Sequence, residues 1–98
     1  MADYQLILAT RVDRQLLNHF EFLLRVSVPA AKRFREEFGN TLREIVANPF
    51  QFPWETDLNL PEKMYRKALF AKRYKILFTV EDHTVYLDAV ADCRQSPG

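Results

Sequence analysis

The segment MYRKALFAKRYKILFTVEDHTVYLDAVADCR, residues 64–94, decides the fold of this chain. It contains runs of β-branched and aromatic residues at 65–70, 74–80 and 84–91, which are separated by two short connectors. Polar and apolar residues alternate in the last two runs, as they do in half-buried strands. Connectors this short join only antiparallel neighbours, because a parallel crossover needs a dozen or more residues. The segment therefore predicts an antiparallel meander with 74–80 in the centre.

Two short turns set the predicted register of this meander. A two-residue turn at 82–83 gives the second hairpin an apolar face that must be covered. A two-residue turn at 71–72 places Arg66 on the opposite, mixed face, together with Lys75 and Asp88. The predicted pairs on the apolar face are Val80 with Val85, Phe78 with Leu87, and Ile76 with Ala89.

The composition predicts one soluble globular domain over residues 1–98. About half of the residues, 48%, are apolar, and the formal net charge is +1. A charge this small lacks the overall basic excess of many nucleic-acid binders, although it leaves room for a local basic patch. The single cysteine, Cys93, allows no intramolecular disulfide, and the sequence shows no signal peptide or membrane span. We therefore expect a cytoplasmic protein.

The first half of the chain predicts one short strand and two helices. The apolar run at 4–8 could add a further strand to the sheet. Apolar residues then recur at helical spacing, first from Asp13 as the N-cap, and again over 29–46 after an N-cap at Ser27. So short a break between the helices predicts an antiparallel hairpin. The expected fold class is α+β in the order β-α-α-β-β-β, with the helical hairpin packed on one face of a small antiparallel sheet.

A loop at 49–61 follows the second helix and carries three aromatic residues, Phe50, Phe52 and Trp54, between prolines. These side chains could form a patch that binds a partner. The alternative, which we favour, is that they fold back over an edge of the core.

The order of these elements, the Asn48-Pro49 step, and the motifs YR at 65–66, RYKILF at 73–78 and VADCR at 90–94 resemble the RelE/ParE toxin superfamily over nearly the whole chain. The resemblance implies a toxin of a bacterial type II toxin–antitoxin module, which arrests growth and stabilises plasmids. It also implies a cognate antitoxin from a neighbouring gene, held in a toxin–antitoxin hetero-oligomer. ParE-like members inhibit DNA gyrase, whereas RelE-like members cut mRNA on the ribosome without a metal or other cofactor.

Residue by residue, the resemblance to the nuclease branch is partial. Arg66, Lys75 and Arg94 stand at or near basic positions of RelE-like enzymes, where cations stabilise charge on the scissile phosphate. Two other such positions hold Ala68 and Phe70, and the late tyrosine or histidine of the nucleases has no counterpart. We therefore favour ParE-like inhibition of gyrase. The alternatives are ribosome-dependent mRNA cleavage by these three cations and a degenerate homologue without toxicity.

The remaining chemistry-bearing residues point to structural roles. His83 lies in a predicted turn and His19 on the first helix, where we expect it at the helix surface. Cys93 has no partner histidine, so a buried thiol is favoured over a nucleophile. One cysteine and two distant histidines make no metal site.

The antitoxin is expected to bind an apolar surface. The first helix carries apolar residues around much of its circumference, among them Phe20, Phe22 and Leu24. We predict that these residues and Trp54 of the aromatic loop form one contiguous antitoxin-binding patch. The strands at 4–8 and from 65 are the candidate sheet edges, where an extended segment could add a strand.

Overall fold

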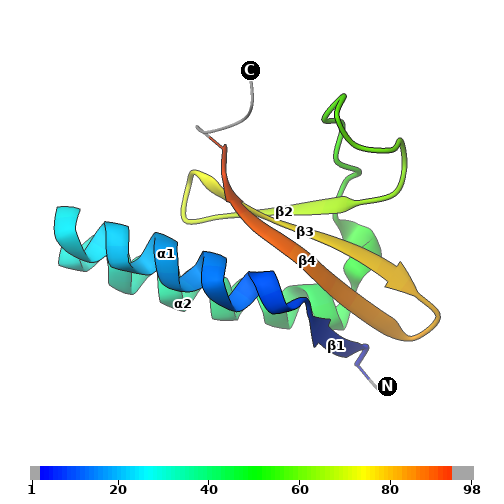
Figure 1. The fold of residues 1–98 in the computed structure, drawn as a ribbon. Helices are drawn as coiled ribbons and strands as arrows, with labels where there is room; N and C mark the ends of the chain where they lie inside the picture. The colour runs from blue at the N-terminus through cyan, green and yellow to red at the C-terminus, as the bar shows by residue number, and fades with distance from the viewer. Residues whose placement is uncertain (1–2, 94–98) are drawn as a thin grey trace.

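The computed structural model describes residues 3–93, which form two helices packed on one face of a four-stranded sheet (Figure 1). The predicted α+β class and element order are confirmed. In chain order the elements are β1 (Gln5–Leu8), α1 (Thr10–Val26), α2 (Val28–Ala47), the 3-10 helix η1 (Pro49–Gln51), β2 (Arg66–Phe70), β3 (Tyr74–Glu81) and β4 (Thr84–Asp92). None of the helices in this part of the chain is long and apolar enough to cross a membrane.

The sheet is mixed, so the prediction of a purely antiparallel sheet was wrong. Its strand order is β1-β4-β3-β2, and β1 pairs with β4 in parallel, with Gln5 opposite Thr84 and Leu8 opposite Leu87. A parallel partner is possible here because the helices and the other strands separate β1 from β4 along the chain. As predicted, β1 and β2 are the outer strands.

The β2–β3 turn is longer than predicted, which reverses the faces of β2. Phe70 pairs with Tyr74, so the turn comprises residues 71–73 rather than 71–72. One extra residue in a turn moves every side chain of the strand to the other face. Ala68 and Phe70 are therefore buried against the helices, and Arg66 does not share a face with Lys75.

A β-bulge in β4 changes the second hairpin as well. The predicted turn at 82–83 and the first pairs after it are confirmed, but the register shifts between Leu77 and Phe78. Leu77 pairs with Ala89 and Phe78 with Leu87, so Asp88 is the extra residue. Ile76 consequently faces Val90 rather than Ala89, and Val90 turns toward the core, where it is 1% exposed.

The helical hairpin covers the apolar face of the sheet. Ser27 links the helices, because its backbone N–H donates to Leu23 at the end of α1, while its hydroxyl accepts from the Ala30 N–H at 3.3 Å. The predicted cap at Ser27 is thus confirmed. The predicted cap at Asp13 was wrong, because α1 begins at Thr10 and Asp13 lies within its first turn. The rings of Phe34, Phe70 and Tyr74 meet at the centre of the core.

The segment after α2 covers the end of the core that the helices leave open. The ring of Phe52 packs edge-on against Phe78, with 5.8 Å between ring centroids. Phe50 and Trp54 remain partly exposed at 54% and 37%. The loop therefore folds back over the core through Phe52, while its other aromatic side chains lie at the surface.

Gly39 provides a test of the α2 geometry. It lies inside α2, and a Cβ atom built there has no neighbour within 4 Å. Because alanine favours a helix interior over glycine and meets no obstacle, Gly39→Ala should raise the free energy of unfolding by about 0.5–1 kcal/mol. Chemical denaturation followed by circular dichroism measures this gain. The exposed neighbour Glu36 supplies the control, since Glu36→Ala should change stability by less than about 0.5 kcal/mol. An unchanged or lowered stability of Gly39→Ala contradicts the prediction.

Candidate functional site

The face of the sheet turned away from the helices holds the candidate site. Residues 53–55 run along the outer edge of β2, where the Lys67 N–H donates to the Pro53 carbonyl at 2.9 Å and the Glu55 N–H donates to the Tyr65 carbonyl at 2.7 Å. The β2 edge is therefore partly covered rather than open. Because side chains alternate along extended backbone, Trp54 lies on the side of Arg66 and Glu55 on the opposite, open face.

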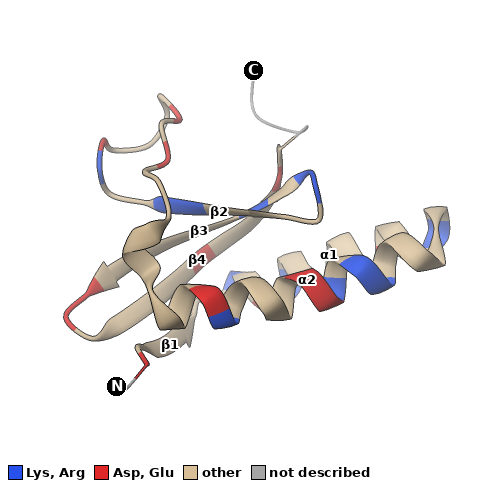
Figure 2. Cartoon of the chain, turned by 180° about the vertical axis from the view of Figure 1, so that it is seen from behind, with Lys and Arg blue, Asp and Glu red and all other residues tan. Residues whose placement is uncertain are grey.

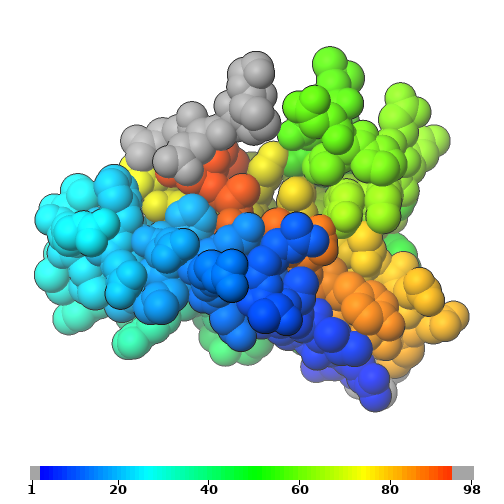
Figure 3. Space-filling model, viewed as in Figure 1, coloured from blue at the N-terminus to red at the C-terminus, as the bar shows by residue number. Residues whose placement is uncertain are grey.

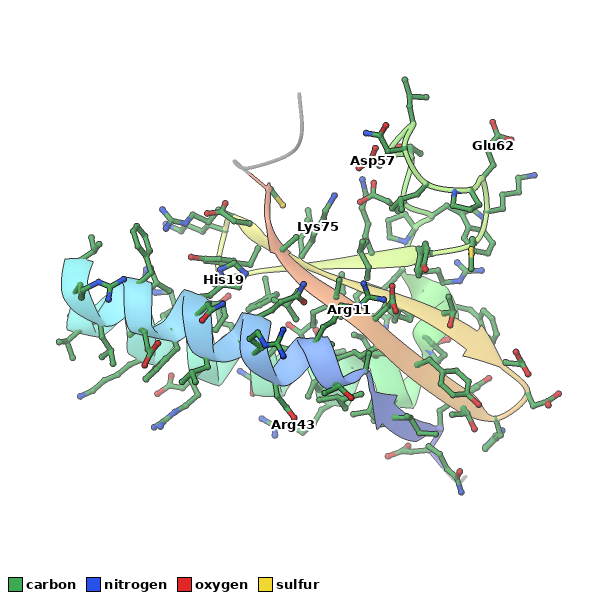
Figure 4. All side chains as sticks on the ribbon, viewed as in Figure 1. Arg11, His19, Arg43, Asp57, Glu62 and Lys75 are labelled. Atoms are coloured by element: carbon green, nitrogen blue, oxygen red, sulfur yellow. The ribbon has the colours of Figure 1, made fainter. Side chains whose placement is uncertain are left out.

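A buried carboxylate, that of Glu55, is the centre of the open face. Glu55 is 6% exposed, and the Lys75 ammonium group forms a short ion pair with its Oε1. Lys67 lies 3.7 Å from its Oε2. The same oxygen accepts hydrogen bonds from the backbone N–H groups of Thr56 at 2.8 Å and Asp57 at 3.2 Å. Figure 4 shows Lys75 on this face and Asp57 in the overhanging loop.

These contacts determine the ionisation of Glu55. Burial alone raises the pKa of this carboxyl group, but the opposing contributions are larger in sum. The hydrogen bond and charge of Lys75, the N–H of Thr56 and the charge of Lys67 together lower the pKa of Glu55 below its ordinary value of 4.5. The carboxylate is therefore ionised at neutral pH, and it lies between the ammonium groups of both lysines.

Arg66, the first predicted phosphate-binding residue, is used within the fold. Its guanidinium group stacks between two rings, 4.0 Å from the Trp54 centroid and 5.1 Å from that of Phe50. It also donates to the Phe52 carbonyl at 2.7 Å. These contacts hold the aromatic segment against the end of the sheet. The side chain is thus separated from Lys75 by the sheet itself, and the two predicted cations do not form one site.

A second polar cluster lies on the open face around the β4 bulge. Arg11, from the start of α1, forms a 3.0 Å ion pair with Asp88. Burial raises the pKa of the Tyr65 phenol, and the charge of Asp88 and its hydrogen bond to the phenol raise this pKa further. The nearby charge of Arg11 acts in the opposite direction. Tyr65 therefore stays protonated and donates to Asp88 at neutral pH.

The other predicted residues have varied placements. Arg94 lies outside the described residues. His83 lies in the turn, as predicted; it is exposed and stacks on Tyr4 with 4.6 Å between ring centroids. His19 was wrongly expected at the helix surface, because it lies between α1 and the sheet and its Nε2 donates to the Val90 carbonyl at 3.1 Å. Cys93 is half-buried. Residues 3–93 contain no group of three or more His, Cys, Asp or Glu side chains placed to hold a metal ion.

The predicted antitoxin-binding residues do not form one patch. Phe22 and Leu24 are 45% and 42% exposed on the last turns of α1, whereas Phe20 is half-buried against the core. Trp54 is exposed on the loop after η1. The end of α1 and this loop lie at opposite ends of the molecule (Figures 1 and 3). The expectation of a single contiguous apolar patch was therefore wrong.

Sequence reasoning missed the residues that shape the open face most strongly, Glu55 and Lys67. Glu55 lies in a loop, and its position in the sequence does not indicate that its carboxylate pairs with Lys67 and Lys75. The alternation of β2 placed Lys67 on the open face only once the turn was known to include Arg73. Comparison with known proteins adds no further assignment, because the chain matches no family model and no curated protein is significantly similar to it.

Removing the charge of Glu55 tests the electrostatic design of the open face. Lys75 and Lys67 have side chains that are 17% and 29% exposed, so both lose part of their compensation in Glu55→Gln. We expect a loss of about 2 kcal/mol in unfolding free energy at pH 7, since partly buried cations without a counter-charge are costly. Glu62→Gln, in the exposed part of the same loop, is the control and should have little effect.

The pH dependence of this loss follows from the sign of the pKa shift. A carboxyl group with a lowered folded-state pKa stabilises the protein above its unfolded pKa and loses this contribution as pH falls through the folded value. The stability difference between the wild type and Glu55→Gln should therefore be largest at neutral pH and shrink below about pH 4.5. Urea denaturation at several pH values measures it, and a difference that is constant with pH would rule out an ionised Glu55 as the cause.

Proposed function

We propose that this chain is a RelE/ParE-superfamily toxin that arrests bacterial growth by binding a macromolecular target, with the gyrase inhibition of ParE-like members as the precedent. The order β-α-α-β-β-β and the placement of the helical hairpin on one face of the sheet support the superfamily. The sequence motifs at 65–66, 73–78 and 90–94 support it independently.

The ion pairs of Glu55 are the observation that favours ParE-like target binding over RelE-like RNA cleavage. A metal-free ribonuclease needs cations free to stabilise charge that develops on the phosphate oxygens. On the open face, Lys75 and Lys67 share the carboxylate of Glu55 instead. Arg66 is held between aromatic rings on the other side of the sheet. This arrangement favours binding without phosphodiester cleavage.

RNA cleavage would require a different arrangement of the loop. Glu55 would have to leave both lysines, together with the backbone N–H groups of Thr56 and Asp57 that hold it. The backbone of Glu55 is itself held at the β2 edge by the hydrogen bond from its N–H to the Tyr65 carbonyl. The number of contacts that oppose this movement makes the RelE-like activity the second candidate.

Two assays in parallel distinguish these activities. The purified protein should inhibit plasmid supercoiling by DNA gyrase at micromolar concentration and leave ribosome-bound mRNA intact. Supercoiling is read on agarose gels, and cleavage by primer extension on mRNA in a translating extract. mRNA cleavage that falls about 10²-fold in Lys75→Ala would establish the ribonuclease instead. Inactivity in both assays would identify a non-toxic homologue.

The proposed toxin needs an antitoxin, and we place its binding surface on the helices. A groove of about 280 Å³ lies between α1 and α2 and is lined by Leu16, Leu17, Phe20, Phe34 and Phe38, with Asp13 and Arg35 also at its wall. Leu17 is 56% exposed, and Phe22 and Leu24 lie further along the same helix. An amphipathic segment of the antitoxin could bury these side chains.

Single substitutions distinguish the end of α1 from the aromatic loop as the surface that binds the antitoxin. If the antitoxin covers α1, Phe22→Asp should weaken the complex at least about tenfold, because it introduces a charge into an apolar contact. Trp54→Ala, at the other end of the molecule, should leave the affinity unchanged. Titration calorimetry with the product of the neighbouring gene measures both. The reverse pattern, with loss only in Trp54→Ala, would place the antitoxin on the loop.

A further inference from the structure

Cations gather at one end of this nearly neutral molecule. The segment 22–35, which joins the helices, contains four Lys or Arg residues and no Asp or Glu. The β2–β3 turn adds two further cations beside it. We call these six residues the basic end. They are Arg25, Lys32, Arg33, Arg35, Lys72 and Arg73. Figure 2 shows them as blue ribbon at the tip of the helical hairpin and at the β2–β3 turn.

A pocket connects the two parts of the basic end. It has a volume of about 190 Å³, and Arg33 of α2 lines it together with Lys72 and Arg73 of the turn. Leu23 and Tyr74 contribute apolar surface to the same pocket. Three cations from parts of the chain that are distant in sequence therefore surround one depression large enough for a phosphate group.

Most of this charge is uncompensated. Within residues 3–93, no ion pair involves Arg25, Lys32, Arg33 or Lys72. Arg73 lies 3.9 Å from Asp92, so its charge is partly balanced. The open face differs, because there Lys67 and Lys75 both pair with the carboxylate of Glu55. Exposed cations that repel one another and have no partner produce a positive potential at this end.

The turn that carries Lys72 is held in an unfavourable conformation. Ala71 and Lys72 both have positive φ angles, of 49° and 70°, which cost L-residues roughly 1–2 kcal/mol each. The carboxylate of Glu37 on α2 accepts a 2.9 Å hydrogen bond from the Ala71 N–H and ties the turn to the helix. The fold thus fixes Lys72 beside Arg33 in spite of charge repulsion and backbone strain.

Glu37 and Asp92 lie beside the basic end, where one binds the turn backbone and the other pairs with Arg73, whereas five other acidic residues lie far from it. Glu81 and Asp82 are at the β3–β4 turn, and Glu55, Asp57 and Glu62 are in the loop before β2. Figure 2 shows these red segments at the opposite end of the molecule from the helix junction. The basic end therefore carries a local excess of positive charge, although the formal net charge of the protein is only +1. A polyanion approaching it would be oriented with the basic end in front.

We propose that the basic end binds the sugar–phosphate backbone of a nucleic acid. Four of its six cations are arginines, whose planar guanidinium groups match phosphate oxygens in pairs. Arg33, Lys72 and Arg73 line one depression that suits a phosphate group, and Arg25, Lys32 and Arg35 add charge on the adjoining helices. This binding does not depend on the proposed target or on cleavage, because the open face takes no part in it.

Fluorescence anisotropy with labelled duplex DNA and labelled single-stranded RNA, at several salt concentrations, tests the proposal and distinguishes the two sources of phosphate. The double variant Arg33→Gln, Lys72→Gln should weaken binding at least about tenfold at low salt and reduce the slope of log K against log salt by about 1.8 on duplex DNA. Both side chains are exposed, so the fold should be retained, and circular dichroism checks this.

The control removes the same charge from other exposed helical positions. Arg14→Gln, Arg43→Gln should keep most of the affinity, because these residues lie outside the basic end. Equal losses in the two double variants would overturn the proposal, since they would show a dependence on net charge alone. So would the absence of wild-type binding to either nucleic acid, or equal binding to polyglutamate or to phosphatidylglycerol vesicles, because the site would then recognise acidic protein or lipid as well as it recognises phosphodiester.

Discussion

The burial of one face of β3 is the constraint on which the rest of the structure depends. Tyr74, Ile76 and Phe78 are at most 2% exposed, and each lies two residues from the next. Because side chains alternate along a strand, these three require an apolar cover on one side, and the residues between them face the other side. The helical hairpin supplies that cover, with Phe34 of α2 against Tyr74. The neighbouring strands must then match the same face.

The strands β2 and β4 meet this requirement in different ways. In β2, a turn through residues 71–73 brings Ala68 and Phe70 onto the buried face. In β4, nine residues lie opposite eight of β3, and the bulge at the unpaired Asp88 restores Val90 to the buried face. Bulges commonly redirect side chains near functional surfaces. Here the extra residue directs Asp88 toward Arg11 and Tyr65.

The charges of the protein fall into two groups with different consequences. On the open face, lysines and a buried carboxylate satisfy one another, so charge there contributes to the placement of the loop. At the basic end, Arg73 pairs with Asp92, but Arg25, Lys32, Arg33 and Lys72 form no ion pair in the described part of the chain, and the turn that carries Lys72 is strained. Electrostatic attraction to another macromolecule is therefore available at the helix junction rather than on the sheet. The formal net charge near zero does not reveal the local excess of cations at the basic end, because it sums the charges of the whole chain.

The sequence by itself determined the order of the elements, the helical hairpin with its cap at Ser27, and the turn at 82–83, since these depend on neighbours along the chain. Only the tertiary structure decided the parallel pairing of β1, the bulge at Asp88 and the faces of β2. Each of these depends on which side chains the helices can bury, and a shift of one residue reverses the outcome. The sequence likewise determined one part of the candidate site, and the tertiary structure decided the other. The periodicity of β3 placed Lys75 correctly on the open face, but its partner Glu55 comes from a loop twenty residues earlier, and their attraction exists only after the loop has folded along β2.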